Sequence, residues 1–229
     1  MTNLSPRSFL AASAASVAAA SLALAQDDQP PTVADCFALR KAGQKIPVVF
    51  DTDIGSDVDD TWALLYLLNS PEVDVRLISV ERGASRERAA IAAKMLQACG
   101  RTDIPIAMGP GRDGRTNQHA WVKDYDLDAY PGEVREDAAA EIVRAVNDSD
   151  DPVTVCAVGP VPNVAAALRK DPFIVGNSRF VGMHGSIRVG YDGSDTPVPE
   201  ANVKNGPAAL RTVFEGDWEA SVTPLDTCG

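Results

Sequence analysis

Short apolar segments alternate with amphipathic helical segments from residue 46 to the end of the chain. Alternation of this kind is typical of an α/β fold in which helices connect the strands of a mostly parallel sheet. We therefore predict a Rossmann-like α/β fold with helices flanking the sheet. Predicted strands cover residues 46–50, 73–80, 104–108, 153–158, 180–183 and 220–223. Predicted helices cover residues 59–68, 85–99, 137–146, 161–169 and 208–214, and Ser85 is expected to cap the second of them.

The first 25 residues differ from the rest and have the pattern of a secretory signal peptide. Arg7 precedes an uncharged, Ala-rich stretch, and the small residues Ala23 and Ala25 mark a cleavage site. A membrane anchor is the less favoured alternative, because the stretch is short and consists mostly of alanine. We expect a protein exported to the periplasm or secreted, with a linker or N-terminal extension at 26–45 and one folded domain at 46–229.

The charge of the chain limits its partners. The net charge is −11 at pH 7, and removal of the signal peptide with Arg7 would change it to −12. A protein this acidic is a poor candidate for binding nucleic acid or an anionic membrane. The sequence leaves open the oligomeric state, including a homo-oligomer. It also leaves open any disulfide pairing among Cys36, Cys99, Cys156 and Cys228.

Five aspartates follow the first predicted strand within residues 51–60. Carboxylates this close repel one another, and the repulsion grows where a strand end restricts hydration. A hard divalent cation would remove that cost, and oxygen ligands favour calcium, magnesium or manganese over zinc or copper. The alternative is a solvated acidic turn in which Asp59 and Asp60 stabilise a helix N-terminus. We favour a cation site, because ligands of α/β sheets bind where strands end.

Two other acidic motifs fit less well. An EF-hand requires glycine at its sixth position and an acid at its twelfth, where this sequence has Ser56 and Trp62. The haloacid-dehalogenase-like phosphatases have the motif D-x-D-x-T/V, and Gly55 stands where Thr or Val belongs. An aspartyl-phosphate phosphatase is therefore a less favoured alternative.

The segment DTDIGSDVDD resembles the D-x-D-x-G-x-D-D hallmark of the inosine/uridine-preferring nucleoside hydrolase family, with two residues inserted. Three later segments are also similar to motifs of that family. They are 157–165, similar to T-G-P-L-T-N-I-A, 182–186, similar to M-G-G, and 200–203, similar to E-F-N. The resemblance implies that residues 46–229 form a nucleoside hydrolase-like domain. Enzymes of the family hydrolyse the N-glycosidic bond of ribonucleosides to ribose and a free base.

The resemblance also implies which residues would hold calcium. Asp53 would be a calcium ligand and the base for the attacking water, as the catalytic residue. Asp60 and the carbonyl of Val158 would be further calcium ligands. Asp51 is expected to brace the loop from behind. Asp57 belongs to the insertion and has no assigned role.

Substrate contacts follow from the same resemblance. Asp59, Glu200 and Asn202 would hold ribose hydroxyls. His184 lies beside the predicted pocket, and we include it as a substrate-binding residue, with simple packing as an equal alternative.

The long loop 109–132 carries further candidates for substrate contact. His119 is either a substrate-side residue or a solvated loop residue, and Trp121 is the better placed tryptophan for stacking on a base. Two departures from the family pattern stand against these matches. Ala84 follows Gly83 where the family has Asn or Asp, and a C-terminal His-Asp pair that the family places near the base and the calcium has no counterpart. The sequence therefore predicts a C-terminally truncated member, which is either an active hydrolase or a degenerate protein that binds calcium and ribose.

Overall fold

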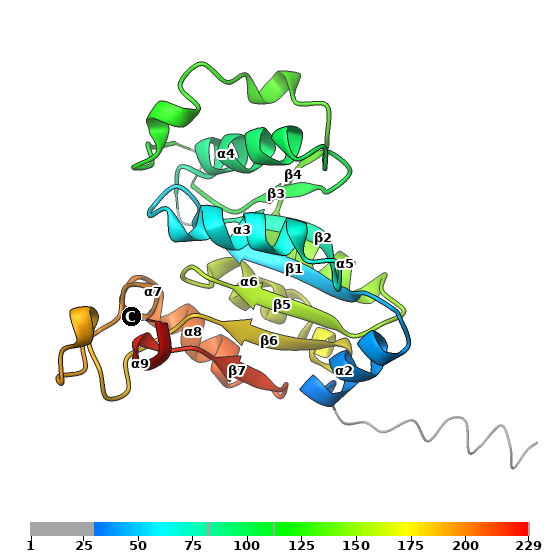
Figure 1. Ribbon diagram of the computed structural model, residues 1–229, viewed down its shortest axis with the longest axis vertical. Helices are drawn as coiled ribbons and strands as arrows, with labels where there is room; N and C mark the ends of the chain where they lie inside the picture. The colour runs from blue at the N-terminus through cyan, green and yellow to red at the C-terminus, as the bar shows by residue number, and fades with distance from the viewer. Residues whose placement is uncertain (1–29, 82, 112, 229) are drawn as a thin grey trace, which may run out of the picture.

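The computed structural model describes residues 30–81, 83–111 and 113–228. In this part of the chain, seven strands form one parallel sheet in the order β4-β3-β2-β1-β5-β6-β7 (Figure 1). The strands are β1 (Ile46–Thr52), β2 (Val73–Val80), β3 (Ile106–Met108), β4 (Val134–Glu136), β5 (Val153–Ala157), β6 (Ser178–Gly182) and β7 (Ala220–Val222). The predicted α/β class with a parallel sheet is confirmed.

The chain enters the sheet at its centre. Strand β1 pairs with β2 on one side and with β5 on the other, so that Asp51 lies opposite Ser79 and Ala157. From β1 the chain moves outward through β2, β3 and β4, then returns to β5 and moves outward in the other direction. A reversal of this kind opens a crevice at the carboxyl ends of the strands. The aspartate cluster follows β1 directly, so the topology places it at this crevice.

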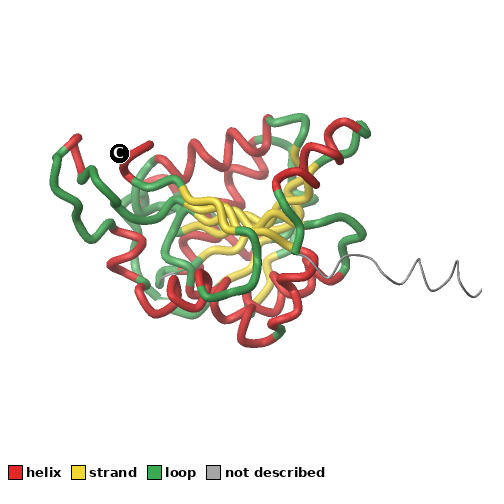
Figure 2. The backbone as a smooth tube through the Cα atoms, turned by 90° about the horizontal axis from the view of Figure 1, so that it is seen from below, coloured by secondary structure: helices red, strands yellow, loops and turns green. Residues whose placement is uncertain are grey.

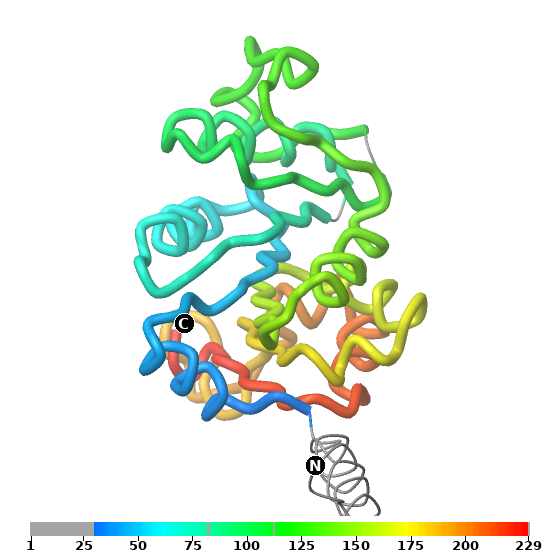
Figure 3. Tube along the Cα trace, turned by 90° about the vertical axis from the view of Figure 1, so that its right-hand side faces the viewer, coloured from blue at the N-terminus to red at the C-terminus, as the bar shows by residue number. Residues whose placement is uncertain are grey.

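Helices cover both faces of the sheet (Figure 2). They are α3 (Asp59–Asn69) and α4 (Ser85–Ala98) on one face, and α5 (Ala138–Asn147), α6 (Pro162–Lys170) and α8 (Pro207–Phe214) on the other. Successive strand residues point to opposite faces, so Val49 and Leu77 enter one apolar core while Phe50 and Ile78 enter the other. The segment between β3 and β4, in green, and the C-terminal α8 and β7, in orange and red, lie at opposite ends of the molecule (Figure 3).

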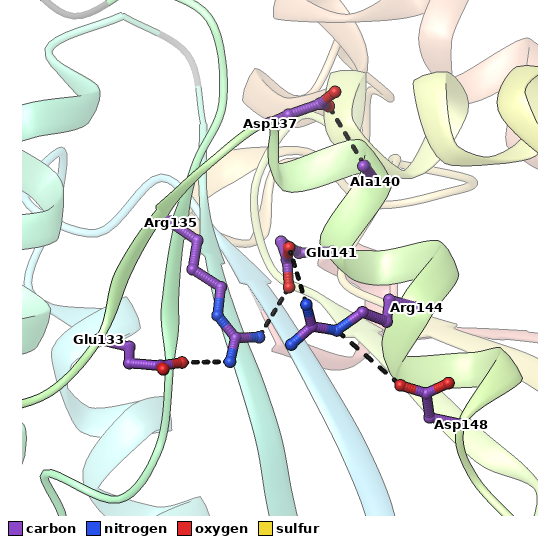
Figure 4. Close-up of polar contacts among 7 residues, drawn as sticks. All are labelled: Glu133, Arg135, Asp137, Ala140, Glu141, Arg144 and Asp148. Carbon is purple, nitrogen blue, oxygen red and sulfur yellow. Dashed lines mark hydrogen bonds and ion pairs between the residues drawn. The ribbon is translucent and has the colours of Figure 1, made fainter.

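Strand β4 was not predicted from the sequence. It is a three-residue edge strand with only one apolar residue, so it carries no alternating apolar pattern. Its central residue, Arg135, donates to Glu141 of α5 across 2.7 Å and also contacts Glu133 (Figure 4). Arg144 of α5 lies 3.7 Å from the same Glu141. Ionic contacts to α5 therefore add to the pairing with β3 and to the packing of Val134 in holding this edge.

Several short helices also lie outside the predicted set. Helix α2 (Val33–Lys41) occupies part of the segment expected to be a linker or N-terminal extension. The others are α7 (Ala201–Asn205), α9 (Leu225–Cys228) and the 3-10 turns η1 (His119–Trp121), η2 (Leu127–Ala129), η3 (Pro172–Asn177) and η4 (Tyr191–Gly193). Helix α2 is as long as α6, but Cys36 is its one buried residue, so it has no apolar face to predict it. The other elements are too short to show a helical period in the sequence.

The predicted cap of α4 is wrong. Ala84, in a left-handed conformation with φ of 46°, precedes the helix, and Ser85 is its first residue. The backbone N–H groups of Ala84 and Ser85 donate to the carbonyls of Asp113 and Gly111. The loop carbonyls therefore accept the hydrogen bonds of backbone N–H groups at the start of the helix. The buried Ser85 hydroxyl has no hydrogen-bond partner among the described residues.

The predicted signal peptide at 1–25 lies outside the described residues, so export stays a prediction. Every helix in the described ranges is too short or too polar to cross a bilayer. The cysteines Cys36, Cys99, Cys156 and Cys228 are free thiols in the structure.

Candidate active site

A cavity of about 270 Å³ lies at the carboxyl end of the sheet, beside the segments that follow β1 and β5. Its wall comes from the loop after β1, the turn after β5, the end of β6, the start of α7 and helix α9. The lining residues are Asp53, Ser56, Asp57, Asp59, Asp60, Val158, Met183, Tyr191, Glu200, Ala201, Asn202, Leu225 and Cys228. A larger hollow of about 710 Å³ beside α5 and α6 contains none of the predicted site residues.

The loop after β1 requires glycine at Gly55. Its φ is +99°, a conformation that other residues adopt at a cost. A Cβ atom there would lie 2.7 Å from Ile91 and 2.9 Å from Thr116. The loop therefore packs directly on α4 and on the segment near Thr116, and this contact accounts for a glycine where phosphatases carry Thr or Val.

Asp53 and Asp60 are buried aspartates of the cavity wall, each 5% exposed. Asp53 accepts a hydrogen bond from the Ser56 hydroxyl at 2.8 Å, and Asp60 accepts one from the Thr52 hydroxyl at 2.6 Å. Burial, together with the charge of Asp53, raises the pKa of Asp60 to about 8. The two carboxylates thus lie where a bound cation would relieve their repulsion.

Asp59 and Asp57 also line the cavity, but both are exposed at its mouth. Asp59 therefore lies beside the cavity, at the start of α3. Asp57, which had no assigned role, joins the same wall, and the Gln118 side chain holds its backbone carbonyl at 2.7 Å.

Asp51 lies behind the cavity and is fully buried. It accepts hydrogen bonds from Ser79 of β2 and, at 3.1 Å, from Asn163 of α6. Burial raises the pKa of Asp51 to about 7, and the two hydrogen bonds partly offset this effect. Asp51 thus links β1 to its neighbours without lining the cavity, which agrees with a bracing role.

The turn after β5 and helix α7 form the opposite wall. The Asn202 side-chain amide donates to the carbonyls of Val158 at 2.9 Å and Met183 at 3.0 Å. Glu200 caps α7 by accepting from the backbone N–H groups of Asn202 and Val203, and it also accepts from Gly185 at 3.0 Å. The residues predicted at Val158, Glu200 and Asn202 therefore lie together, tied into one hydrogen-bonded unit.

His184 is not brought to the cavity. Its ring is 3% exposed and packs with the rings of Phe180 and Phe214, at centroid distances of 5.7 and 6.2 Å. Its Nε2 donates to the carbonyl of Gly159 at 3.0 Å, and burial lowers the pKa of the imidazole. The ring is thus placed as the packing alternative expects, because aromatic residues enclose it, and contact with substrate stays a prediction.

The candidates on the long loop also lie outside the cavity wall. Trp121 is 47% exposed, and its carbonyl accepts from Lys94. His119 lies 2.6 Å from Glu87, which in turn accepts from the backbone and hydroxyl of Thr116. The aromatic residue that does line the cavity is Tyr191, whose hydroxyl accepts from the backbone N–H of Ala201 at 2.8 Å.

Two further charged residues at the site were missed from the sequence. Glu81 is fully buried at the end of β2, and a Cβ on Gly159 would lie 2.5 Å from its Oε1 and 2.9 Å from Asp53 Oδ1. Arg88 of α4 is 6% exposed and donates to the backbone of residues 53–57, the aspartate loop that follows β1. A signal existed for Arg88, because it continues the apolar stripe of α4 that includes Ile91.

The donors around the cavity suit a hard cation. They are carboxylate, amide and carbonyl oxygens, and calcium prefers such ligands. Within the described residues, no three His, Cys, Asp or Glu side chains already surround one point as a metal site. The buried Asp60, with its raised pKa, and its neighbour Asp53 are nevertheless the pair that a cation would stabilise most.

Residues 48–229 match the family described as inosine-uridine preferring nucleoside hydrolase. The match spans most of the chain and includes every residue of the cavity wall. The chain belongs to this family. The resemblance inferred from four short motifs is therefore confirmed.

Relatives in bacteria and plants share this similarity. A non-specific ribonucleoside hydrolase of Klebsiella pneumoniae is 30% identical over 193 residues, which cover 80% of this chain and 62% of that protein. A probable uridine nucleosidase of Arabidopsis thaliana is 31% identical over a match that covers 75% of this chain and 56% of that protein. An inosine-uridine preferring nucleoside hydrolase from Bacillus anthracis has the same fold, with a TM-score of 0.66 at 22% identity. The match covers 79% of this chain and 65% of that chain. The chain thus spans less than two thirds of the length of each of these proteins.

Proposed function

We propose that this protein is a calcium-dependent ribonucleoside hydrolase, which uses water to cleave the N-glycosidic bond and releases ribose and a free base. One observation carries the proposal. Asp53, Asp59 and Asp60 converge with Glu200 and Asn202 on a single cavity, in a chain that belongs to a nucleoside hydrolase family. The activity of the whole protein is proposed, since the chain covers only part of its relatives' length.

The acidic wall suits the charge that this reaction develops. As the bond between the anomeric carbon and the base nitrogen breaks, the ribose ring gains oxocarbenium character and positive charge. Preorganised carboxylates beside the ring stabilise that charge in the transition state more than in the ground state. Asp53 and Asp60 are buried, so their interaction with the ring is weakly screened by water.

Asp53 is the proposed general base. Its carboxylate is held by the Ser56 hydroxyl and can take the proton of a water that attacks the anomeric carbon. The oxygen of that water forms the new bond to the anomeric carbon. The electron pair of the broken bond leaves with the nucleobase. Calcium, when bound, supplies Lewis-acid chemistry that orients the water and lowers its pKa.

Three groups would hold the cation and three others the sugar. Asp53, Asp60 and the carbonyl of Val158 would ligate calcium, because the Val158 oxygen keeps a lone pair beside the Asn202 amide. Asp59, Glu200 and Asn202 would accept or donate hydrogen bonds to the ribose hydroxyls. The amide nitrogen of Asn202 is already bonded to two carbonyls, which fixes the side chain before substrate arrives.

The proposal is tested by measuring free base released from inosine and uridine, with calcium and with a chelator. We expect turnover by the wild type in calcium, loss on chelation, and a decrease of about 10²–10⁴-fold in kcat for Asp53→Asn, the range for loss of a general base. Asp148→Asn is the matched control, since this exposed residue follows the last residue of α5, away from the cavity. It should keep wild-type activity.

Two outcomes would replace the proposal. Stabilisation of the wild type by calcium without base release from any nucleoside would contradict the hydrolase and support a calcium- and ribose-binding protein. Release of phosphate from a phosphomonoester in magnesium would support a phosphatase instead.

A further inference from the structure

Arg88 is a buried cation among acidic groups. The side chain is 6% exposed, although an arginine rarely leaves water without acceptors for its five N–H groups. Its Nε donates to the carbonyl of Gly83 at 3.1 Å, and its Nη2 donates to the Ser56 hydroxyl at 3.2 Å. Its Nη1 donates to the carbonyl of Ile54 at 2.7 Å and also to that of Asp53. Most of its donors thus point at the aspartate loop.

The remaining carbonyls of that loop are held from the other side. The backbone N–H of Gln118 donates to Gly55 at 3.2 Å, and the Asn117 side chain donates to Ser56 at 2.5 Å. The Gln118 side chain donates to Asp57 at 2.7 Å. Every carbonyl from Asp53 to Asp57 therefore accepts a hydrogen bond.

This arrangement decides which atoms of the loop face the cavity. With the carbonyls engaged on the protein side, the loop presents carboxylates to the ligand space. The Ser56 hydroxyl receives the Arg88 Nη2 donor and itself donates to Asp53, so Arg88 reaches the proposed catalytic carboxylate through one intermediate. A guanidinium fork fixes such a loop better than an ammonium, because its planar donors reach several acceptors at once.

We propose that Arg88 is a positioning residue that holds the Asp53–Asp57 loop in its cation-binding conformation before a cation arrives. The proposal rests on the proposed function for the presence of a cation at Asp53 and Asp60. Preorganisation lowers the cost of ordering the loop on binding, so Arg88 raises cation affinity even though its positive charge repels the cation. Loss of the loop geometry therefore predicts weaker cation binding when Arg88 is replaced, whereas loss of the positive charge alone predicts tighter binding.

The experiment compares Arg88→Lys, which keeps the charge but loses the fork, with Arg88→Gln, which keeps a donor but loses the charge. Calcium affinity is measured by calorimetry and terbium affinity by luminescence, on the full purified chain. We expect both variants to bind about 10–100-fold more weakly, the range for residues that orient metal ligands. Terbium lifetimes in H₂O and D₂O should show more bound waters in both variants, because a loosened loop supplies fewer ligands.

Arg135→Lys and Arg135→Gln are the matched controls, since Arg135 makes a similar fork to Glu133 and Glu141 at the far edge of the sheet. They should bind both ions as the wild type does, whatever their thermal stability. A second measurement needs no cation. Hydrogen exchange of residues 53–57 in the cation-free protein should be faster in both Arg88 variants and unchanged in the Arg135 variants.

Each outcome bears on a specific statement. Wild-type affinity and water number in Arg88→Lys and Arg88→Gln, or tighter binding by Arg88→Gln, would overturn the positioning role and leave the proposed function intact. A wild type that binds neither ion would overturn the cation site of the proposed function, and the role of Arg88 in cation affinity with it. Unchanged exchange at residues 53–57 would overturn the preformed loop.

Discussion

Two glycines let the turns of the candidate active site approach one another. Gly55 packs against Ile91 and Thr116, and Gly159 lies against Glu81 and Asp53, with no room for a Cβ at either position. At Gly159 the nearest atoms are carboxylate oxygens and a backbone nitrogen, so the turn after β5 faces two buried carboxylates directly. The orientation of Asp53 therefore depends on the absence of a side chain at Gly159.

Gly159→Ala should impair activity more than stability. The new Cβ would lie 2.9 Å from both the backbone nitrogen and Oδ1 of Asp53, so the carboxylate must turn. We expect a destabilisation of about 1–3 kcal/mol, typical of overpacking, and a decrease in kcat measured with the nucleoside assay. Gly176→Ala is the control, because a Cβ there meets nothing within 4 Å. Wild-type kcat in Gly159→Ala would show that Asp53 keeps its orientation without this close approach.

Helix α4 supports the site through two adjacent residues. Arg88 holds the aspartate loop, while Glu87 holds the loop that carries Thr116 and His119. The second loop in turn donates from Gln118 to the first. One helix therefore positions both the aspartate loop and the loop that carries Thr116, although neither Glu87 nor Arg88 lines the cavity.

The Glu87 contacts should depend on pH. Burial raises the pKa of Glu87, but hydrogen bonds from Thr116 and His119 outweigh it and lower the pKa below the ordinary value. A lowered carboxylate pKa contributes stability that is full above the unfolded pKa, about 4.3, and is lost as pH falls through the folded pKa. We expect hydrogen-exchange protection of residues 116–119 to decrease below about pH 4 in the wild type.

Glu87→Gln tests this dependence. The variant should show weaker protection of residues 116–119 at neutral pH and no step on acidification. Glu215→Gln, at an exposed position after α8, should behave as the wild type. An unchanged acid step in Glu87→Gln would assign the transition to another group.

The whole sheet brings the site residues together. Asp53 and Asp60 follow β1, Val158 follows β5, and Glu200 lies beyond β6, far apart in the sequence. Because the strands are parallel and β1 lies beside β5, the segments that follow them open at the same edge. The cavity is therefore a consequence of strand order, and a ligand bound there links segments on both sides of β1.

Calcium should stabilise the folded protein as a whole. A ligand that binds only the native state adds about 2.7 kcal/mol at one hundred times its Kd, so the unfolding temperature should rise with calcium and return on chelation. Asp60→Asn should lose most of this shift, because it removes a buried carboxylate from the proposed site. Differential scanning calorimetry measures both, with Asp148→Asn as control. An equal calcium shift in Asp60→Asn and the wild type would place the cation elsewhere.

Local patterns were enough to predict the central strands, most of the longer helices and the family. Those patterns arise from burial of one face of an element, which repeats in the sequence with the period of the element. The aspartates after β1 were found because they cluster directly after a predicted strand. Val158, Glu200 and Asn202 were found because they stand in motifs that resemble those of the family. Their assignment to one cavity then followed from the parallel sheet.

Other features depended on contacts between distant segments. A charged side chain of α5 contacts strand β4, and loop carbonyls accept hydrogen bonds from the start of α4. The rings of two phenylalanines pack against His184. Arg88 is a polar residue on an apolar stripe, and its partners Asp53, Ile54 and Ser56 lie more than thirty residues away. The sequence by itself therefore determined the class of fold and the family, and it proposed the acidic residues of the candidate site. Only the tertiary structure decided which groups hold them in place, because a buried polar side chain is defined by partners that local sequence does not contain.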